Sequence, residues 1–209
     1  EKSVNCKTAP NARNNPYNLG TGNCVMLNPL NNDLFVEQPF QTTVREKVFL
    51  EGIGLHSGRF VRMSIRPAPA NSGIKFRRTD INGQKSTVIA HASYAKQARL
   101  CTRIVNSEGI TLETIEHLMA TFAGMGLDNA VIETDASEAP ILDGSCKPIL
   151  DAITNAGLEV LPAKRKHMVV TKSVEVQLEP GAWARLEPSD HLQINVNIDF
   201  DDHAIGKQA

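Results

Sequence analysis

The sequence predicts an α+β protein, because strand-like and helix-like apolar patterns both recur along the chain. Residues 42–50 and 59–66 alternate between apolar and polar side chains on either side of a glycine-rich turn, which predicts a β-hairpin. Residues 111–126 instead carry apolar residues at helical spacing. Strict alternation returns at residues 192–200, which predicts a late strand.

Composition excludes several classes of protein. The 209 residues are 41% apolar and 22% charged, which is enough material for one sizeable core. The net charge of -1 favours neither nucleic acid nor an acidic membrane as a partner. No apolar run is long enough for a transmembrane segment, and no secretory signal is recognisable. Four widely spaced cysteines without a C-x-x-C motif favour free thiols in a reducing compartment: Cys6, Cys24, Cys101 and Cys146.

Residues 1–40 are rich in asparagine and proline and show little apolar periodicity. We expect a flexible N-terminal extension, since such a segment buries too little apolar surface to offset the entropy of ordering it. The sequence opens on Glu1, so Met26 is a candidate natural start. Residues 1–25 would then be upstream sequence or the tail of a cleaved leader.

The chain from Thr42 onward predicts mainly strands. After the hairpin of 42–50 and 59–66 comes a proline-rich loop, and residues 74–78 begin a third strand. Residues 86–92 predict a weak strand and residues 100–105 a stronger one. His56 lies at the tip of the hairpin, where a side chain can reach a site, although a solvent-exposed turn histidine is the simpler interpretation.

The predicted helix at 111–126 has two different faces. One face is an apolar stripe that should lie on a sheet, formed by Ile115, Leu118, Met119 and Phe122. The other face holds Glu116 and His117 beside small residues, where a second packed layer or a site would lie. A solvated surface pair is the alternative for these two residues. Gly124 and Gly126 are typical of a helix end.

A second helix is predicted after a short buried strand at 130–133. We expect Ser145 to cap this helix, Pro148 to lie in its first turn and Gly157 to end it. Its core face should contain Ile149, Leu150 and Ile153.

The basic segment 162–166 predicts a connector between domains. Beyond it, strands are expected at 167–178, 182–186 and 192–200, with a turn at Pro180 and Gly181. No helix is predicted to cover these strands, although a sheet face must be buried against something. We therefore expect the truncated start of a second domain.

Five motifs in this order closely resemble the N-terminal half of the UDP-3-O-acyl-N-acetylglucosamine deacetylase family, from about residue 42 to about residue 208. They are GIGLHSG at 52–58, RPAPANSGIKFRRTD at 66–80, LCT at 100–102, TIEHLMATFAGMGLDNAVIE at 114–133 and PILDGS at 140–145. The resemblance implies two similar α+β domains, each a two-layer arrangement of a sheet and a helix pair. Domain I would occupy residues 41–163, and residues 164–209 would begin an incomplete domain II.

The resemblance also implies a function: zinc-dependent hydrolysis of the N-acetyl group of UDP-3-O-acyl-N-acetylglucosamine in lipid A synthesis, with release of acetate. Zinc lowers the pKa of its bound water to about 7 and polarises the amide carbonyl. By the resemblance, Glu116 is the general base and His117 is a zinc ligand. Asp143 matches a supporting residue of the D-G-S turn. Four further residues match positions at the substrate cleft: His56, Leu100, Cys101 and Thr102.

The zinc site implied by the resemblance is incomplete in this sequence. A catalytic zinc needs about three protein ligands, and the family supplies two of them from an H-x-x-x-D helix in its second domain. No histidine of this chain has aspartate four residues later. We therefore expect one Zn²⁺ ligand here, two in a missing C-terminal half that is the main intramolecular partner, and no activity of the 209 residues alone.

The same residues are consistent with two other interpretations. The protein could be a truncated, non-catalytic homologue that acts as a binding module, or an unrelated α+β domain with a solvated Glu-His pair. Near-neutral charge and free thiols fit a bacterial cytoplasm, and an organelle matrix equally well.

Overall fold

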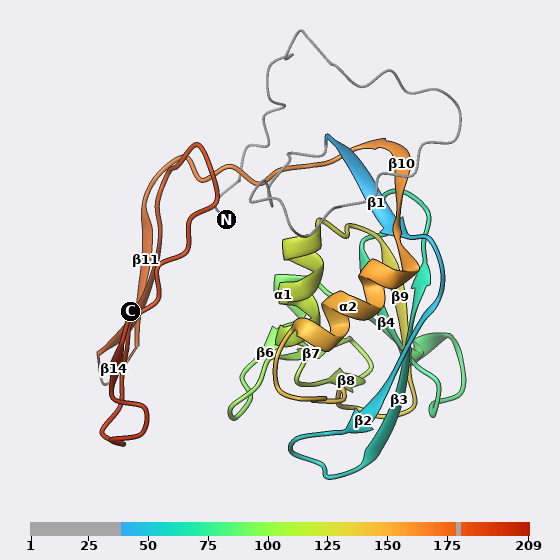
Figure 1. Ribbon diagram of the computed structural model, residues 1–209, viewed down its shortest axis with the longest axis horizontal. Helices are drawn as coiled ribbons and strands as arrows, with labels where there is room; N and C mark the ends of the chain where they lie inside the picture. Colours follow the sequence, from blue (N-terminus) through green and yellow to red (C-terminus); the bar gives the residue numbers. More distant parts are fainter. Residues whose placement is uncertain (1–38, 179–180) are drawn as a thin grey trace, which may run out of the picture. The chain divides into compact units, whose positions relative to one another are not determined.

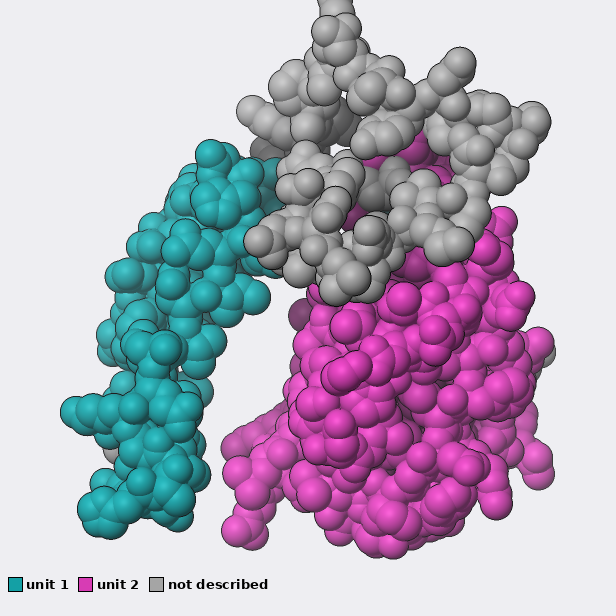
Figure 2. Space-filling model, viewed as in Figure 1, with its two compact units in different colours: residues 1–14, 166–209 teal, residues 15–165 magenta. Residues whose placement is uncertain are grey.

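The computed structural model of the protein describes residues 39–178 and 181–209. Residues 39–165 belong to one compact unit, and the described residues from 166 onward belong to a second (Figure 2). The predicted flexible extension, Met26 and two of the cysteines fall on residues 1–38 and lie outside the described residues. Phe40, which was expected to end the extension, is already part of a strand.

The first unit is an α+β fold of two layers, as predicted. A five-stranded sheet runs in the order β2–β3–β9–β4–β5, and helices α1 and α2 lie on one of its faces (Figure 1). Only β4 and β9 are parallel neighbours. The bounds are β2 Val48–Ile53, β3 Phe60–Pro67, β4 Ile74–Arg78, β5 Thr87–Ile89, β9 Ala130–Thr134, α1 Glu116–Met125 and α2 Lys147–Ala156.

The core lies between the inner face of this sheet and the two helices. Alternate strand residues point to one face, so one set of each strand is buried. The buried strand residues include Leu50, Met63, Ile65, Phe76, Val88 and Ile132. They pack with helix residues Leu118, Phe122, Ile149 and Ile153, each at most 2% exposed. The predicted stripe of the first helix is thus confirmed, but Leu150 is 38% exposed and was wrongly placed on the core face of the second helix.

Helix α1 begins later than predicted. Residues 111–112 form β8 (Thr111–Leu112), which pairs with β7 (Arg103–Val105) rather than continuing the helix. Thr114 has a φ of 57°, a left-handed conformation that a right-handed helix excludes. The helix ends as predicted at Gly126, whose φ is 69°.

The predicted strand at 42–50 is in fact two strands. The chain bends after β1 (Phe40–Val44), and β1 pairs with β10 (Leu158–Lys164) instead of continuing into β2. Strand β10 contains most of the segment that was predicted to be a basic connector. An alternating pattern identifies extended chain but not the strand with which it pairs, so the sequence alone did not reveal this pairing.

Two smaller differences concern segment ends. Residues 100–102 precede β7, so the strand expected at 100–105 is shorter than predicted. The N-cap of α2 is Cys146, although the hydroxyl of Ser145 accepts a hydrogen bond from the Lys147 N–H at 3.2 Å. The remaining short elements are 3₁₀ turns at Gln84–Ser86 and Ala92–Tyr94, and β6 (Ala95–Lys96), which pairs with β7.

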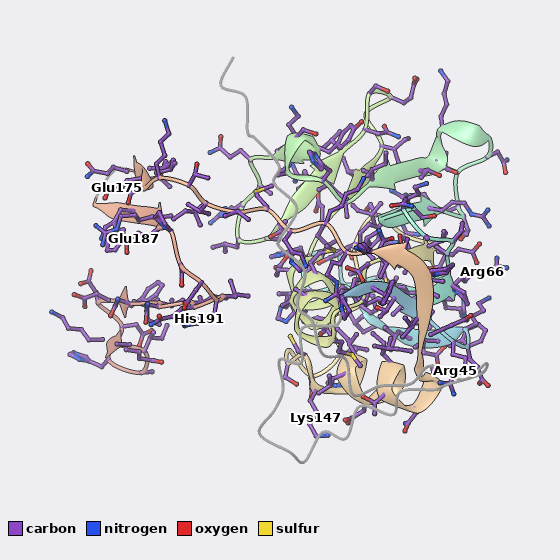
Figure 3. All side chains as sticks on the ribbon, turned by 90° about the horizontal axis from the view of Figure 1, so that it is seen from above. Arg45, Arg66, Lys147, Glu175, Glu187 and His191 are labelled. Atoms are coloured by element: carbon purple, nitrogen blue, oxygen red, sulfur yellow. The ribbon has the colours of Figure 1, made fainter. Side chains whose placement is uncertain are left out.

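The second unit consists of strand pairs. The predicted hairpin is present as β11 (Val174–Leu178) and β12 (Ala182–Leu186), and β13 (Ile198–Asp199) pairs with β14 (Lys207–Gln208). The strands expected at 167–178 and 192–200 are therefore much shorter than predicted. Arg185 contacts Glu175 and Glu187 on the charged side of the hairpin (Figure 3). That these strands begin a second domain stays a prediction.

Asn129 ties β1 to the sheet from a fully buried position. Its Nδ2 donates to Gln41 Oε1 at 3.0 Å, and its Oδ1 accepts the Gly73 N–H at 3.0 Å. Its carbonyl accepts the hydroxyl of Thr43 at 2.8 Å. The side-chain amide and the backbone carbonyl of this one buried residue thus bond to two segments that are far from it in the sequence, β1 and the turn at Gly73.

Glu133 organises the outer, solvent-facing side of the sheet. Its side chain is 12% exposed and forms ion pairs with Arg66, at 3.0 Å, and with Arg77 (Figure 3 labels Arg66). Burial alone would raise the pKa of this carboxyl, but the hydrogen bond from Arg66 and the charges of Arg77 and Arg66 hold the pKa below its ordinary value.

We predict that Asn129→Ala destabilises the first unit by about 1–3 kcal/mol, because it leaves buried partners without hydrogen bonds. Urea unfolding followed by circular dichroism measures this. Asn155→Ala, at an exposed position of α2, is the matched control and should change stability by less than about 0.5 kcal/mol. Equal effects of the two substitutions would contradict the role given to Asn129.

We predict that Glu133 makes stability depend on acid pH. Because its pKa is lower in the folded state than in the unfolded state, its stabilising contribution is present above the ordinary glutamate pKa of about 4.3 and is lost as the pH falls through the folded value. Unfolding free energies measured between pH 3 and pH 7 should fall less steeply at the acid end in Glu133→Gln than in the wild type. Parallel curves for the two proteins would refute this.

Candidate functional site

An open pocket of about 370 Å³ brings together residues that are distant in the sequence. Its lining residues are His56, Arg99, Leu100, Cys101, Arg103 and Glu113. Three of these were singled out from the sequence: His56 at the tip of the β2–β3 hairpin, and Leu100 and Cys101 before β7. The structure therefore places the hairpin tip and the segment 100–101 on the walls of one pocket.

Glu116 connects α1 to this pocket wall. It is the first residue of α1, where the partial positive charge of the helix N-terminus favours a carboxylate. Its Oε2 accepts the backbone N–H of Thr102 at 2.9 Å. Within the described parts of the chain, Oε1 has no hydrogen-bond partner, so this oxygen is free to accept a proton.

His117 follows on the same helix turn and is half-buried. Its carbonyl accepts hydrogen bonds from the Thr121 hydroxyl at 2.8 Å and from Cys146 Sγ at 3.5 Å, which joins the start of α1 to the start of α2. Its ring makes no hydrogen bond to any residue that the structure describes. In its neutral form such an imidazole can offer one ring nitrogen to a ligand, either Nδ1 or Nε2 according to the tautomer.

The described residues do not by themselves form a metal site. Across residues 39–178 and 181–209, no three histidine, cysteine, aspartate or glutamate side chains gather where they could hold one metal ion. His117 can therefore supply one ligand position, but these ranges do not complete a zinc site around it.

Leu100 and Cys101 lie in an irregular segment. Leu100 is 82% exposed and has a φ of 58°, a conformation that is uncommon for a leucine. Cys101 is a free, half-buried thiol. The pocket wall that was predicted to be a strand is thus a bend, and the residue after it, Thr102, is hydrogen-bonded to Glu116.

Asp143 does not line the pocket. It is exposed, and its Oδ1 accepts both the N–H and the hydroxyl of Ser145 at 2.9 Å. These two hydrogen bonds hold the pKa of the Asp143 carboxyl below its ordinary value. Asp143 therefore stabilises the turn before α2.

Sequence reasoning missed three charged residues of the pocket: Arg99, Arg103 and Glu113. Nε of Arg103 lies 2.6 Å from Oε1 of Glu113, in an ion pair without hydrogen-bond geometry. The two arginines bring positive charge to the pocket, which Glu113 offsets only in part. The arginines were present in the segment 99–103, but their convergence with His56 depends on chain folding.

Glu138 is a further residue that sequence reasoning missed. It follows β9 and is 2% exposed. Its carboxylate accepts the N–H groups of His56 and Ser57, each at 2.8 Å, and the hydroxyl of Thr114 at 3.0 Å. Burial raises the pKa of this carboxyl, but the hydrogen bonds from Ser57, His56 and Thr114 outweigh burial and lower it overall. Glu138 is therefore ionised at neutral pH.

No helix in the parts of the chain that the structure describes is long and apolar enough to cross a membrane.

Comparison with known proteins agrees with the motifs. Residues 41–209 match the sequence model of the family described as LpxC, UDP-3-O-acyl N-acetylglycosamine deacetylase. UDP-3-O-acyl-N-acetylglucosamine deacetylases from Shewanella sp. (strain ANA-3) and Shewanella baltica (strain OS155 / ATCC BAA-1091) are each 44% identical over 161 residues, which cover 77% of this chain and 52% of each relative. The enzyme of that name from Shewanella halifaxensis (strain HAW-EB4) is 41% identical over 168 residues, 80% of this chain and 54% of its own.

The chain thus spans about half the length of the curated relatives it matches. The family match covers the hairpin with His56 and the Leu100–Thr102 segment, which meet at the pocket. It also covers the helix with Glu116 and His117, which do not line the pocket but are linked to it by the hydrogen bond from Thr102 to Glu116. The chain belongs to the UDP-3-O-acyl N-acetylglycosamine deacetylase family.

Proposed function

We propose that this chain contributes the first part of the active site of a deacetylase that hydrolyses the N-acetyl group of UDP-3-O-acyl-N-acetylglucosamine in lipid A synthesis. The observation that carries the proposal is the placement of Glu116: its carboxylate is fixed through one oxygen by the Thr102 N–H and has its other oxygen free, beside the pocket wall of Leu100 and Cys101.

In the proposed reaction, a water attacks the carbonyl carbon of the acetamide and gives a proton to Glu116. The C–N bond then breaks, acetate leaves, and the sugar nitrogen takes up a proton to become a free amine. A carboxylate within hydrogen-bond reach of the water is the group such a step requires. The hydrogen bond from the Thr102 N–H orients the Glu116 carboxylate for this role.

Further residues would bind the substrate. His56, Leu100, Cys101 and Thr102 lie on or beside the pocket wall and would contact the sugar, while Arg99 and Arg103 supply positive charge for an anionic nucleotide. Asp143 would support the site through the turn that precedes α2.

Members of this family are zinc enzymes in general. We propose His117 as one zinc ligand, since its ring makes no hydrogen bond to a described residue and it follows Glu116 at the start of α1. The other ligands, two by the family pattern, would come from outside the described residues.

Location is part of the same proposal. Cys101 and Cys146 are free thiols, which supports a reducing compartment such as a bacterial cytoplasm, or an organelle matrix in a eukaryote.

We predict that, in the protein purified from its source, Glu116→Ala lowers kcat by a factor of about 10²–10⁴, the usual contribution of a general base. Zinc content, measured by mass spectrometry of the metal, should stay near that of the wild type. Glu46→Ala, at an exposed bend, is the matched control and should leave kcat unchanged. Loss of zinc together with activity would show that Glu116 is a ligand, and unchanged activity would refute its role as base.

We predict that the isolated 209-residue chain loses zinc on dialysis against a mild chelator, because the described residues group no three ligands. Metal analysis before and after dialysis measures this, with His117→Ala as the comparison. Stoichiometric zinc that survives dialysis in the wild type, but not in His117→Ala, would show that the chain completes its own site.

A further inference from the structure

Glu138 is buried without a cationic partner in the described part of the chain. It is one of the largest fully buried side chains, and no ion pair joins it to any described lysine, arginine or histidine. A buried carboxylate is costly unless hydrogen bonds compensate for its lost hydration. Here the compensation comes from two backbone N–H groups and the Thr114 hydroxyl, at 2.8, 2.8 and 3.0 Å, and from the side chain of Ser57.

These three donors belong to two different segments of the site. The N–H groups of His56 and Ser57 lie in the loop at the tip of the β2–β3 hairpin, and the loop carries the pocket residue His56. The hydroxyl of Thr114 lies two residues before Glu116, at the start of α1. One carboxylate therefore joins the loop that carries His56 to Thr114, the residue that leads into the helix with Glu116 and His117.

The backbone at Thr114 is strained. A β-branched residue with a φ of 57° is a conformational outlier, with a typical cost of about 1–3 kcal/mol. Such a conformation persists only when its surroundings fix it. The hydrogen bond to Glu138 is one such constraint, and it acts at the point where the chain leaves β8 and turns into α1.

Gly54 shows how closely the loop approaches the carboxylate. A Cβ at this position would lie 2.6 Å from Glu138 Oε2 and 2.5 Å from Ser57 Oγ, which is closer than real atoms approach. At Gly52, two residues earlier, a Cβ would meet its nearest neighbours at an ordinary 3.4 Å. The absence of a side chain at Gly54 thus allows Glu138 to reach the loop.

We infer that Glu138 is a positioning residue of this site: its carboxylate fixes the His56 loop and the start of α1 relative to each other, and so sets where His56 stands with respect to Glu116 and His117. The inference rests on the proposed function for what those three side chains do. The hydrogen-bonded arrangement itself does not depend on that function.

The test is site-resolved amide hydrogen exchange by NMR on the 209-residue chain without metal or substrate. In Glu138→Gln, the amides of His56 and Ser57 should exchange at least about tenfold faster, as expected for loss of a charge-assisted hydrogen bond. The imidazole resonances of His117 should shift, while amides in the middle of α2 keep their protection. Gly54→Ala should reproduce both effects without changing any charge, and Gly52→Ala should not.

Glu133→Gln is the matched control, since it removes the same charge from a carboxylate on the outer face of the sheet. It should leave the His56 and Ser57 amides and the His117 ring unchanged. Unaltered exchange at His56 and Ser57 in Glu138→Gln would overturn the inference. So would equal acceleration in Glu133→Gln, or loss of protection throughout α2, because either would show a general effect on stability.

If Glu138→Gln does not fold, the pair Gly54→Ala and Gly52→Ala decides the question by the same two readouts. Failure of the proposed function would appear separately, as retained activity in Glu116→Ala, because the exchange measurement requires no turnover.

Discussion

Burial of one face of the five-stranded sheet under α1 and α2 is the constraint on which the rest of the first unit depends. Because the helices cover only the inner face, the strands bury alternate residues against them, although in β3 Ser64 on the other face is also buried. The outer face is mixed: Glu133 and its two arginines lie on it together with exposed apolar side chains that include Phe49 and Phe60. A bridge between Gly54 and Pro140 joins the β2–β3 hairpin to the segment after β9.

The site is built on carboxylates that hold backbone N–H groups. Glu116 accepts the N–H of Thr102, and Glu138 accepts those of His56 and Ser57. Main-chain donors are fixed by the path of the chain, so each carboxylate positions a whole segment and not just one side chain. The pocket walls are consequently tied to the start of α1 by few but strong, charge-assisted interactions.

Motifs predicted part of the candidate site, and the missing part has a physical explanation. His56, Leu100 and Cys101 were identified from short sequence segments, and the structure places them on one pocket; their roles in substrate binding stay predictions. Glu138 was not identified, because its partners are 81, 82 and 24 residues away and its segment reads as an ordinary acidic loop. Arg99, in an irregular segment, and Arg103, at the start of β7, were overlooked for a similar reason, since a charged residue at such a position is most often solvated.

The sequence by itself determined which stretches alternate and which have helical spacing, and so the hairpin, the apolar stripe of α1, the glycine that ends α1 and the family. Those properties are local, because side-chain periodicity follows from the geometry of a single strand or helix. Only the tertiary structure decided that residues 42–50 divide between two sheets, that β10 replaces the expected connector and that α1 starts at Glu116. These depend on strand pairing and on buried hydrogen bonds between distant residues, which compete with local preference and are not encoded in any short stretch of the chain.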